Sequence, residues 1–203
     1  MPIHIIFETH STTEDNESGI ASGWKDCALS ELGRLQAVEL GKRRRNDGIQ
    51  AVFTSDLRRA IDTAQIAFAG TSIPIFYDWR LRECDYGDRN GLPVASVHNP
   101  RVHYLDQPYP NGESWRQAAQ RIGRFLEDLP LRWNGKRVLV IGHRATHFGL
   151  DHHLKGLSLE GLLVAKFVWQ EGWEYRLLNE QDSSYETCSS EPLEPKVNSD
   201  NTI

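Results

Sequence analysis

Short apolar segments alternate with longer helix-like segments along most of this chain. The clearest apolar segment, residues 137–141 (RVLVI), and the first, residues 3–7, are brief and rich in β-branched side chains, which is typical of buried strands. Further strands are predicted at 50–54, 73–77, 163–169 and 175–178, and helices at 30–45, 56–69, 114–129 and 146–154. Because alternating strands and helices build a mostly parallel sheet covered on both faces, we expect an α/β fold, a three-layer α/β/α sandwich.

The 203 residues divide into one expected domain and an acidic tail. Residues 180–203 hold six acidic side chains against one lysine, so the net charge of −5 lies there and residues 1–179 carry equal numbers of acidic and basic side chains. The tail has little apolar surface to bury and is expected to be disordered. Residues 1–179 are expected to form a single domain. Within it, residues 84–112 are rich in Gly and Pro and are predicted to form an irregular insertion, called the lid below.

Charge and hydropathy exclude two classes of partner. The balanced charge of residues 1–179 does not provide the basic surface of a nucleic-acid-binding protein, and the basic run at 42–45 is interpreted as a solvated helix end. No apolar run reaches the roughly 18–20 residues that span a bilayer, and the first ten residues lack the features of a signal peptide. No membrane association and a cytoplasmic location are therefore expected. The oligomeric state stays open, with a homodimer as one option.

Histidines follow two of the best-defined predicted strands. His10 comes after the first strand and His143 after the strand at 137–141. In open α/β sheets ligands bind at the carboxyl ends of the strands, so these two side chains are candidates for a shared site. Together with Arg59 they would offer a nucleophile, a second donor and an anion-binding group. A purely structural role for each histidine is the alternative at this point.

Six short blocks occur in order between residues 3 and 178. They are residues 9–16 (THSTTEDN), 23–37 (GWKDCALSELGRLQA), 55–64 (SDLRRAIDTA), 81–87 (LRECDYG), 111–114 (NGES) and 138–143 (VLVIGH). In this order the blocks resemble those of the histidine phosphatases, also called the phosphoglycerate mutase-like superfamily. The first block keeps the His, Thr and Asn of that family's motif RHGxTxxN.

The resemblance implies phosphoryl transfer through a phosphohistidine. It assigns the nucleophile to His10, bidentate phosphate binding to Arg59, and further phosphate contacts to His143 and Asn16. It makes Glu83 the acid that protonates the leaving alcohol and then activates water. A neutral imidazole suits this chemistry because a phosphomonoester dianion repels an anionic nucleophile. The resemblance implies neither a metal nor another cofactor, and a small phosphate ester as the partner.

The departures from the motif are as informative as the matches. Thr9 stands at the position of the motif's first arginine, Ser11 at its glycine, and Arg144 where a glycine usually follows the second histidine. An uncompensated loss of that arginine predicts a catalyst weaker by roughly 100- to 1000-fold. We hypothesise that Arg144 supplies the missing charge from the second strand end. The alternative is that Arg144 points to solvent or caps a carbonyl.

Glu8 is unusual because it interrupts an apolar strand. A buried carboxylate is costly unless it is paired, so Glu8 is expected either to pair with Arg144 or Arg59 or to emerge into water. If it enters the site, its negative charge would favour a less charged ligand.

Three further side chains are candidates for the pocket. Trp24 and Arg82 are candidate contacts for the distal part of a substrate, and His147 is predicted to line the pocket. His147 and Asp151 have a spacing compatible with metal ligation, but no accompanying motif supports a metal site, and none is predicted.

The favoured interpretation is a phosphatase that acts on a small, soluble phosphomonoester. A phosphoglycerate mutase-type phosphotransferase and a pseudophosphatase that binds a ligand without efficient catalysis are the alternatives. A third alternative is a hydrolase or isomerase that uses Glu8 with His10 on another substrate; its sign would be a Glu8 carboxylate aimed into the pocket.

Overall fold

The computed structural model describes residues 1–178, and the predicted tail lies outside the described residues. A five-stranded sheet has the order β4-β3-β6-β1-β7. β1 (Ile3–Thr9), β3 (Ala51–Thr54), β4 (Ile75–Tyr77) and β6 (Arg137–Gly142) are parallel, and β7 (Trp173–Leu177) pairs antiparallel with β1. This mixed α/β fold with a mostly parallel sheet confirms the predicted fold class.

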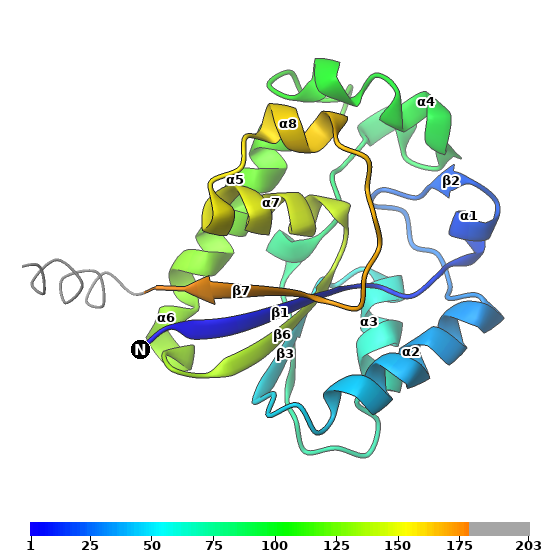
Figure 1. The fold of residues 1–203 in the computed structure, drawn as a ribbon. Helices are drawn as coiled ribbons and strands as arrows, with labels where there is room; N and C mark the ends of the chain where they lie inside the picture. The colour runs from blue at the N-terminus through cyan, green and yellow to red at the C-terminus, as the bar shows by residue number, and fades with distance from the viewer. Residues whose placement is uncertain (179–203) are drawn as a thin grey trace, which may run out of the picture.

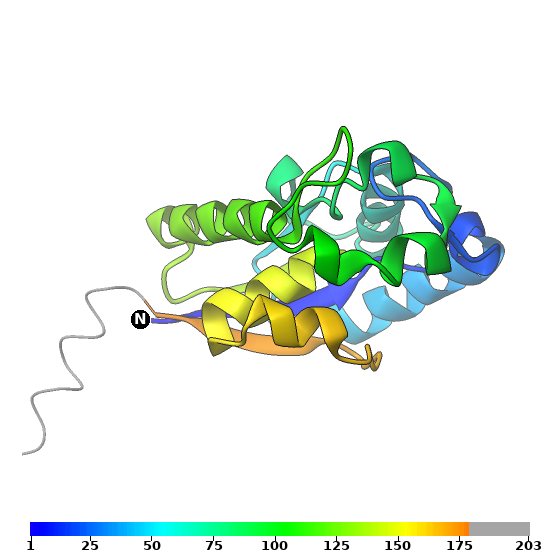
Figure 2. The same ribbon diagram turned by 90° about the horizontal axis from the view of Figure 1, so that it is seen from above.

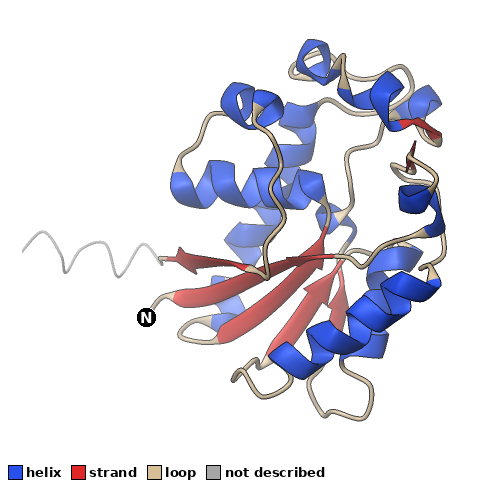
Figure 3. Ribbon diagram, turned by 45° about the vertical axis from the view of Figure 1, so that its right-hand side comes forward, coloured by secondary structure: helices blue, strands red, loops and turns tan. Residues whose placement is uncertain are grey.

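Helices cover both faces of this sheet (Figures 1 and 3). α2 (Glu31–Arg44) and α3 (Arg58–Ala67) lie on one face, and α5 (Trp115–Asp128) and α7 (Arg144–Lys155) lie on the other, with α6 (Pro130–Trp133) leading from α5 towards β6. Side chains alternate along β1, so Ile5 and Phe7 belong to the core beneath α5 and α7, whereas Ile6 belongs to the core beneath α2 and α3. The centre of β1 is therefore buried on both sides.

Side-chain caps fix where the long helices begin. The Ser30 hydroxyl accepts a hydrogen bond from Gly33 N at the start of α2, and Ser114 forms a capping box with Gln117 at the start of α5. Both helix starts confirm the sequence prediction. α7 begins at Arg144, two residues earlier than predicted, because His143 itself is the cap residue.

The lid and the loop after β1 lie side by side above the strand ends (Figure 2). The lid contains η2 (Gly87–Arg89), β5 (Leu92–Pro93), α4 (Val94–His98) and η3 (Arg101–Tyr104), and η1 (Trp79–Leu81) precedes it. The loop contains α1 (Glu14–Glu17) and β2 (Ile20–Ala21), and β2 pairs antiparallel with β5. This pairing joins the lid to the segment that follows the nucleophile candidate.

The predicted strand at 163–169 is wrong. Its first residues belong to α8 (Leu159–Val164), and the segment that follows is irregular. Leu159, Leu162 and Leu163 are buried at helical spacing, whereas Val164 and Trp169 are exposed. A short apolar run does not distinguish a strand from a helix turn by periodicity alone, which explains the error.

Candidate active site

The pairing of β1 with β6 brings two histidines together. Thr9 and Gly142 are partners at the ends of these strands, and His10 N donates a hydrogen bond of 2.9 Å to the Gly142 carbonyl. The rings of His10 and His143 have centroids 4.9 Å apart. The sheet thus places at one point two side chains that lie far apart in the sequence.

His10 is held as a neutral imidazole with one nitrogen free. Its Nδ1 lies 2.8 Å from the Ser11 carbonyl, which can only accept, so Nδ1 carries the proton. Burial, and next the positive charge of Arg59, lower the pKa of His10 to about 3, against a smaller opposite effect of the Ser11 hydrogen bond. Nε2 therefore keeps its lone pair at neutral pH, and the ring lines the pocket.

Arg59 stands beside His10 without a carboxylate partner in the described part of the chain. Its side chain is buried, and its two terminal nitrogens donate to the carbonyls of Lys25 (3.1 Å) and Gly23 (2.7 Å). Gly23 has a φ of 56°, and a Cβ there would collide with Asn90, so glycine is required where the carbonyl turns towards Arg59. These contacts fix a guanidinium whose charge is uncompensated at the pocket.

His143 presents a second unfilled nitrogen. Its Nε2 lies 2.7 Å from the Ser55 hydroxyl, and its buried Nδ1 has no hydrogen-bond partner among residues 1–178. Burial, followed by the charge of Arg59 and the proximity of His10, holds the pKa of His143 well below its usual value. When the Ser55 hydroxyl donates to Nε2, the ring proton sits on Nδ1 and is available to a ligand oxygen.

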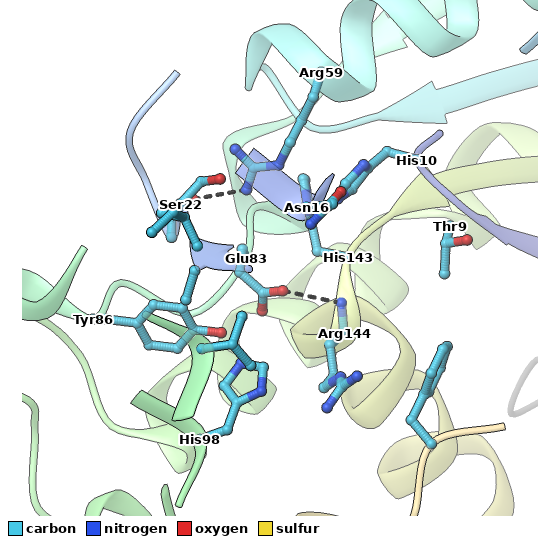
Figure 4. Close-up of a pocket in the computed structure, with 15 residues that line it drawn as sticks. Thr9, His10, Asn16, Ser22, Arg59, Glu83, Tyr86, His98, His143 and Arg144 are labelled. Carbon is cyan, nitrogen blue, oxygen red and sulfur yellow. Dashed lines mark hydrogen bonds between the residues drawn. The ribbon is translucent and has the colours of Figure 1, made fainter. Parts of the chain in front are cut away.

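Glu83 is positioned by the first turn of α7. Its Oε1 accepts hydrogen bonds from the backbone of Cys84 (2.8 Å) and Ala145 (3.0 Å), and its Oε2 accepts one from Arg144 N at 3.2 Å. The Glu83 carbonyl accepts from Trp24 Nε1 at 2.6 Å, so its backbone is held as well. The carboxylate faces the same pocket as His10 (Figure 4).

Arg121 is a supporting residue that the sequence reasoning missed. Its buried guanidinium donates to the carbonyls of Arg80, Arg82 and Glu83 and pairs with Glu113 at 2.6 Å. A signal was present in the sequence, because Arg121 lies on the apolar face of its helix, three residues after Ala118. A buried arginine at such a position indicates a fixed polar partner.

The pocket formed by these side chains has a volume of about 230 Å³. Glu83 is the only acidic side chain among the described residues that line it. The lining comprises Thr9, His10, Asn16, Ile20, Ala21, Ser22, Gly23, Arg59, Glu83, Tyr86, Val94, His98, His143, Arg144 and Phe167. The pocket therefore combines an anion-binding end near Arg59 with a partly apolar end near the lid (Figure 4).

Comparison with known proteins identifies the family. The sequence model of the histidine phosphatase superfamily (branch 1) matches residues 5–167, most of the chain. This chain belongs to the histidine phosphatase superfamily. The 2,3-bisphosphoglycerate-dependent phosphoglycerate mutase of Neisseria meningitidis serogroup C is 29% identical over 215 residues, covering 86% of this chain and 95% of that protein.

Solved structures with different names superpose on this chain. Bacillus stearothermophilus YhfR superposes with a TM-score of 0.73 at 28% identity, covering 83% of this chain and 88% of that one. A mycobacterial glucosyl-3-phosphoglycerate phosphatase in complex with VO3 gives a TM-score of 0.72 at 26% identity, covering 80% and 87%. The relatives of this superfamily member thus include both mutases and phosphatases.

Two motif residues of this histidine phosphatase superfamily member, Asn16 and Ser11, also stabilise the local backbone. Asn16 Oδ1 accepts from Thr13 N in a capping box, while the residue also lines the pocket. Ser11 N donates to Thr63 Oγ1 at 3.0 Å, and the Ser11 carbonyl orients His10. Thr9 lines the pocket beside His10. The loop geometry after β1 is therefore built by these residues independently of any ligand.

Arg144 lies at the lid end of the pocket. Its guanidinium carbon is 4.8 Å from the centroid of the Phe167 ring, and its charge helps to lower the pKa of His98 to about 4, after burial as the larger cause. Arg144 is half-buried, and its guanidinium makes no hydrogen bond to a carbonyl among residues 1–178. That it replaces the missing arginine at the phosphate stays a prediction.

Three sequence predictions about the pocket are wrong. Arg82 does not line it, because its guanidinium makes two hydrogen bonds of 2.6 Å to Asp56 and stacks on Trp24. Trp24 lies behind Glu83 and supports its carbonyl rather than lining the cavity. His147 is buried between Phe7 and Trp173 in the core, with its Nε2 3.3 Å from Asp151.

The prediction for Glu8 is also wrong. The side chain is 2% exposed, and its carboxylate accepts from Arg44 Nε at 2.8 Å and from Arg43 at 3.4 Å, not from Arg59 or Arg144. Two arginines of the basic run at 42–45 are therefore bound to a buried acid, and the run is not a simple solvated helix end. Glu8 does not line the pocket that holds Arg59. It borders a second cavity together with His10, but its carboxylate is bound there by the two arginines, which argues against a hydrolase or isomerase that uses Glu8 as a free carboxylate.

No group of three or more His, Cys, Asp or Glu side chains in residues 1–178 has the arrangement of a metal site. In the same part of the chain, no helix has the length and apolar character needed to cross a bilayer.

Proposed function

We propose that this protein is a phosphatase that hydrolyses a small phosphomonoester through a phosphohistidine at His10. The observation that carries the proposal is the state of His10: a neutral ring, with Nδ1 tied to the Ser11 carbonyl and Nε2 free, beside the uncompensated guanidinium of Arg59. A nucleophile with a lone pair and a cation to hold the phosphoryl oxygens are the two requirements of this chemistry.

The first step forms a nitrogen–phosphorus bond and breaks the ester bond. The lone pair of His10 Nε2 attacks phosphorus while Arg59 and His143 Nδ1 donate to the phosphoryl oxygens. The electron pair of the breaking bond goes to the alcohol oxygen, which takes a proton from Glu83. The Ser11 carbonyl, which accepts from Nδ1, stabilises the positive charge that develops on the imidazole.

The second step transfers the phosphoryl group to water. Glu83, now a carboxylate, accepts a proton from the attacking water, the nitrogen–phosphorus bond breaks, and inorganic phosphate leaves. The neutral imidazole and the protonated Glu83 are thereby restored. Three backbone donors around the Glu83 carboxylate orient it for both steps.

The test is phosphate release from p-nitrophenyl phosphate and a panel of sugar and glycerate phosphates. His10→Ala is expected to abolish release, whereas His103→Ala, an exposed lid histidine outside the pocket, is expected to keep it. Mass spectrometry of the rapidly quenched wild type should locate an acid-labile phosphoryl group on His10. Equal activity of His10→Ala and wild type would refute the mechanism.

Two alternatives have their own support. Phosphoglycerate mutases match most of the chain at 29% identity, so transfer of the phosphoryl group back to the bound alcohol is the first alternative. Thr9 in place of the motif's arginine supports the second, a pseudophosphatase. Isomerised product from a phosphoglycerate would indicate the mutase, and binding without release or isomerisation would indicate the pseudophosphatase.

A further inference from the structure

Arg144 is a pocket arginine with unused donors. Its guanidinium lines the cavity and stacks on Phe167, and within residues 1–178 it makes no hydrogen bond and no ion pair. Arg82, by contrast, is paired with Asp56. A stacked guanidinium with five free N–H groups facing a cavity is a binding group for a ligand acceptor.

Phe167 fixes where this guanidinium lies. Its ring is partly buried and packs against the core, with centroids 6.0 Å from those of Trp173 and of His147. The guanidinium therefore rests on a rigid flat surface rather than swinging in solvent. Less rotamer entropy is lost when a ligand binds a group that is already positioned in this way.

The charge of Arg144 acts on the lid end of the pocket. Burial is the largest cause of the lowered pKa of His98, Arg101, His10 and His143. The next cause is the charge of Arg144 for the first two and the charge of Arg59 for the last two. The two pocket arginines thus serve different regions. Arg59 belongs to the phosphoryl end and Arg144 to the lid end.

Glu83 lies between these two regions (Figure 4). In the proposed mechanism Glu83 contacts the ester oxygen of the leaving alcohol, so the rest of that alcohol extends past Glu83 towards the lid. Glu83 and Arg144 line the same cavity of about 230 Å³, and Arg144 N donates to Glu83 Oε2. An alcohol that passes Glu83 towards the lid therefore reaches the part of the cavity that Arg144 lines.

We propose that Arg144 binds a negatively charged group on the alcohol part of the substrate, so that the substrate is a small phosphomonoester carrying a second anionic group, a carboxylate or a phosphate. This inference rests on the proposed function, because that function fixes which end of the pocket holds the leaving alcohol. Arg144 is then a specificity-determining residue.

Three esters of similar size test the charge requirement. 2-Hydroxyethyl phosphate has a neutral end, phosphoglycolate ends in a carboxylate, and ethane-1,2-diyl bisphosphate ends in a second phosphate. The wild type is expected to show a kcat/KM at least about 10-fold higher for an anionic ester than for the neutral one, as expected for a charge-assisted hydrogen bond. Comparing the two anionic esters identifies which anion is preferred.

Variants assign that preference to Arg144. Arg144→Gln is expected to lower kcat/KM for the preferred anionic ester roughly 10- to 100-fold, mainly through KM, and for the neutral ester less than about 3-fold. Arg144→Lys keeps the positive charge but cannot donate two parallel hydrogen bonds to one anion, so it should retain part of the preference for the anionic ester. Arg132→Gln, at an exposed arginine of α6 outside the pocket, is the matched control and should change nothing.

Each remaining result is decisive. Equal losses on all three esters in Arg144→Gln would overturn the inference and place Arg144 on the transferred phosphoryl group. Hydrolysis that depends on His10 but shows no preference for an anion would overturn the inference and leave the proposed function standing. If no ester is hydrolysed, the proposed function fails, and the inference that rests on it fails with it.

Discussion

Introducing an arginine at position 9 is the sharpest test of how the phosphoryl group is held. The block that contains His10 resembles a motif with arginine at the position of Thr9, and Thr9 lines the pocket beside His10. Side chains alternate along β1, so an arginine at position 9 would face away from Glu8, whose carboxylate is already bound by two arginines. The new guanidinium would therefore be free to reach the pocket.

The expected gain follows from the charges already present. At the phosphoryl end, Arg59 is the one guanidinium that lines the pocket among the described residues, because Arg144 lies against Phe167 at the lid end. A preorganised donor to a transition-state oxyanion contributes about 3–4 kcal/mol, or roughly 100- to 1000-fold in rate. Repulsion from Arg59 and Arg144 reduces this, so Thr9→Arg is expected to raise kcat/KM by about 100-fold.

The assay compares kcat/KM for p-nitrophenyl phosphate in the wild type, Thr9→Arg and Thr9→Gln. The glutamine variant adds a comparable side chain without charge and controls for shape, and thermal unfolding confirms that each variant is folded. A rate for Thr9→Arg no higher than that for Thr9→Gln would refute the reasoning. The phosphoryl end would then already have the positive charge it can use.

Three further predictions concern other parts of the molecule. Burial lowers the pKa of His98 to about 4, so between about pH 6.5 and 4 the unfolded chain binds a proton that the folded protein does not, and the free energy of unfolding falls as the pH drops. His98→Gln should reduce the slope of the unfolding free energy against pH by up to about one proton. An unchanged slope contradicts this prediction. Glu8→Leu should destabilise the fold by about 2 kcal/mol in urea unfolding, with activity kept, because it removes the buried partner of Arg43 and Arg44 and leaves them only their contacts with Asp47 and Glu171; unchanged stability contradicts it. Glu83→Gln should lower kcat/KM for an alkyl ester by on the order of 100-fold and that for p-nitrophenyl phosphate much less. The reason is that kcat/KM covers the steps up to loss of the alcohol, and p-nitrophenolate leaves without a proton; equal losses in kcat/KM contradict the acid role.

The sequence predicted most of the fold because its local signals are strong. Residues 3–7 and 137–141 are rich in β-branched side chains, which favour strands, and Ser30 and Ser114 are recognisable helix caps. The prediction for residues 163–169 failed because their apolar side chains fit both a strand and a helix period. The helix is selected only by the packing of Leu162 and Leu163 in one cluster with lid residues such as Val97 and Leu105.

The site was predicted less completely than the fold. Strand ends and ordered motif blocks were enough to nominate His10 and His143, whose contact is set by backbone pairing. The partners of Glu8, Trp24 and Arg82 could not be read from the sequence, because each depends on a residue from a distant segment that the tertiary fold brings alongside. Long-range polar contacts have no periodic signature.

The register between β1 and β6 has a consequence for how this protein could diversify. Because the separation of the two histidines is fixed by main-chain bonds in the sheet, replacing α4 and η3 alone would leave the placement of His10 and His143 unchanged. Exchanging the stretch that carries α4 and η3 for that of another superfamily member would then retune which alcohol is accepted. In this fold, substrate recognition can therefore change by replacement of one loop segment while the two histidines keep their positions.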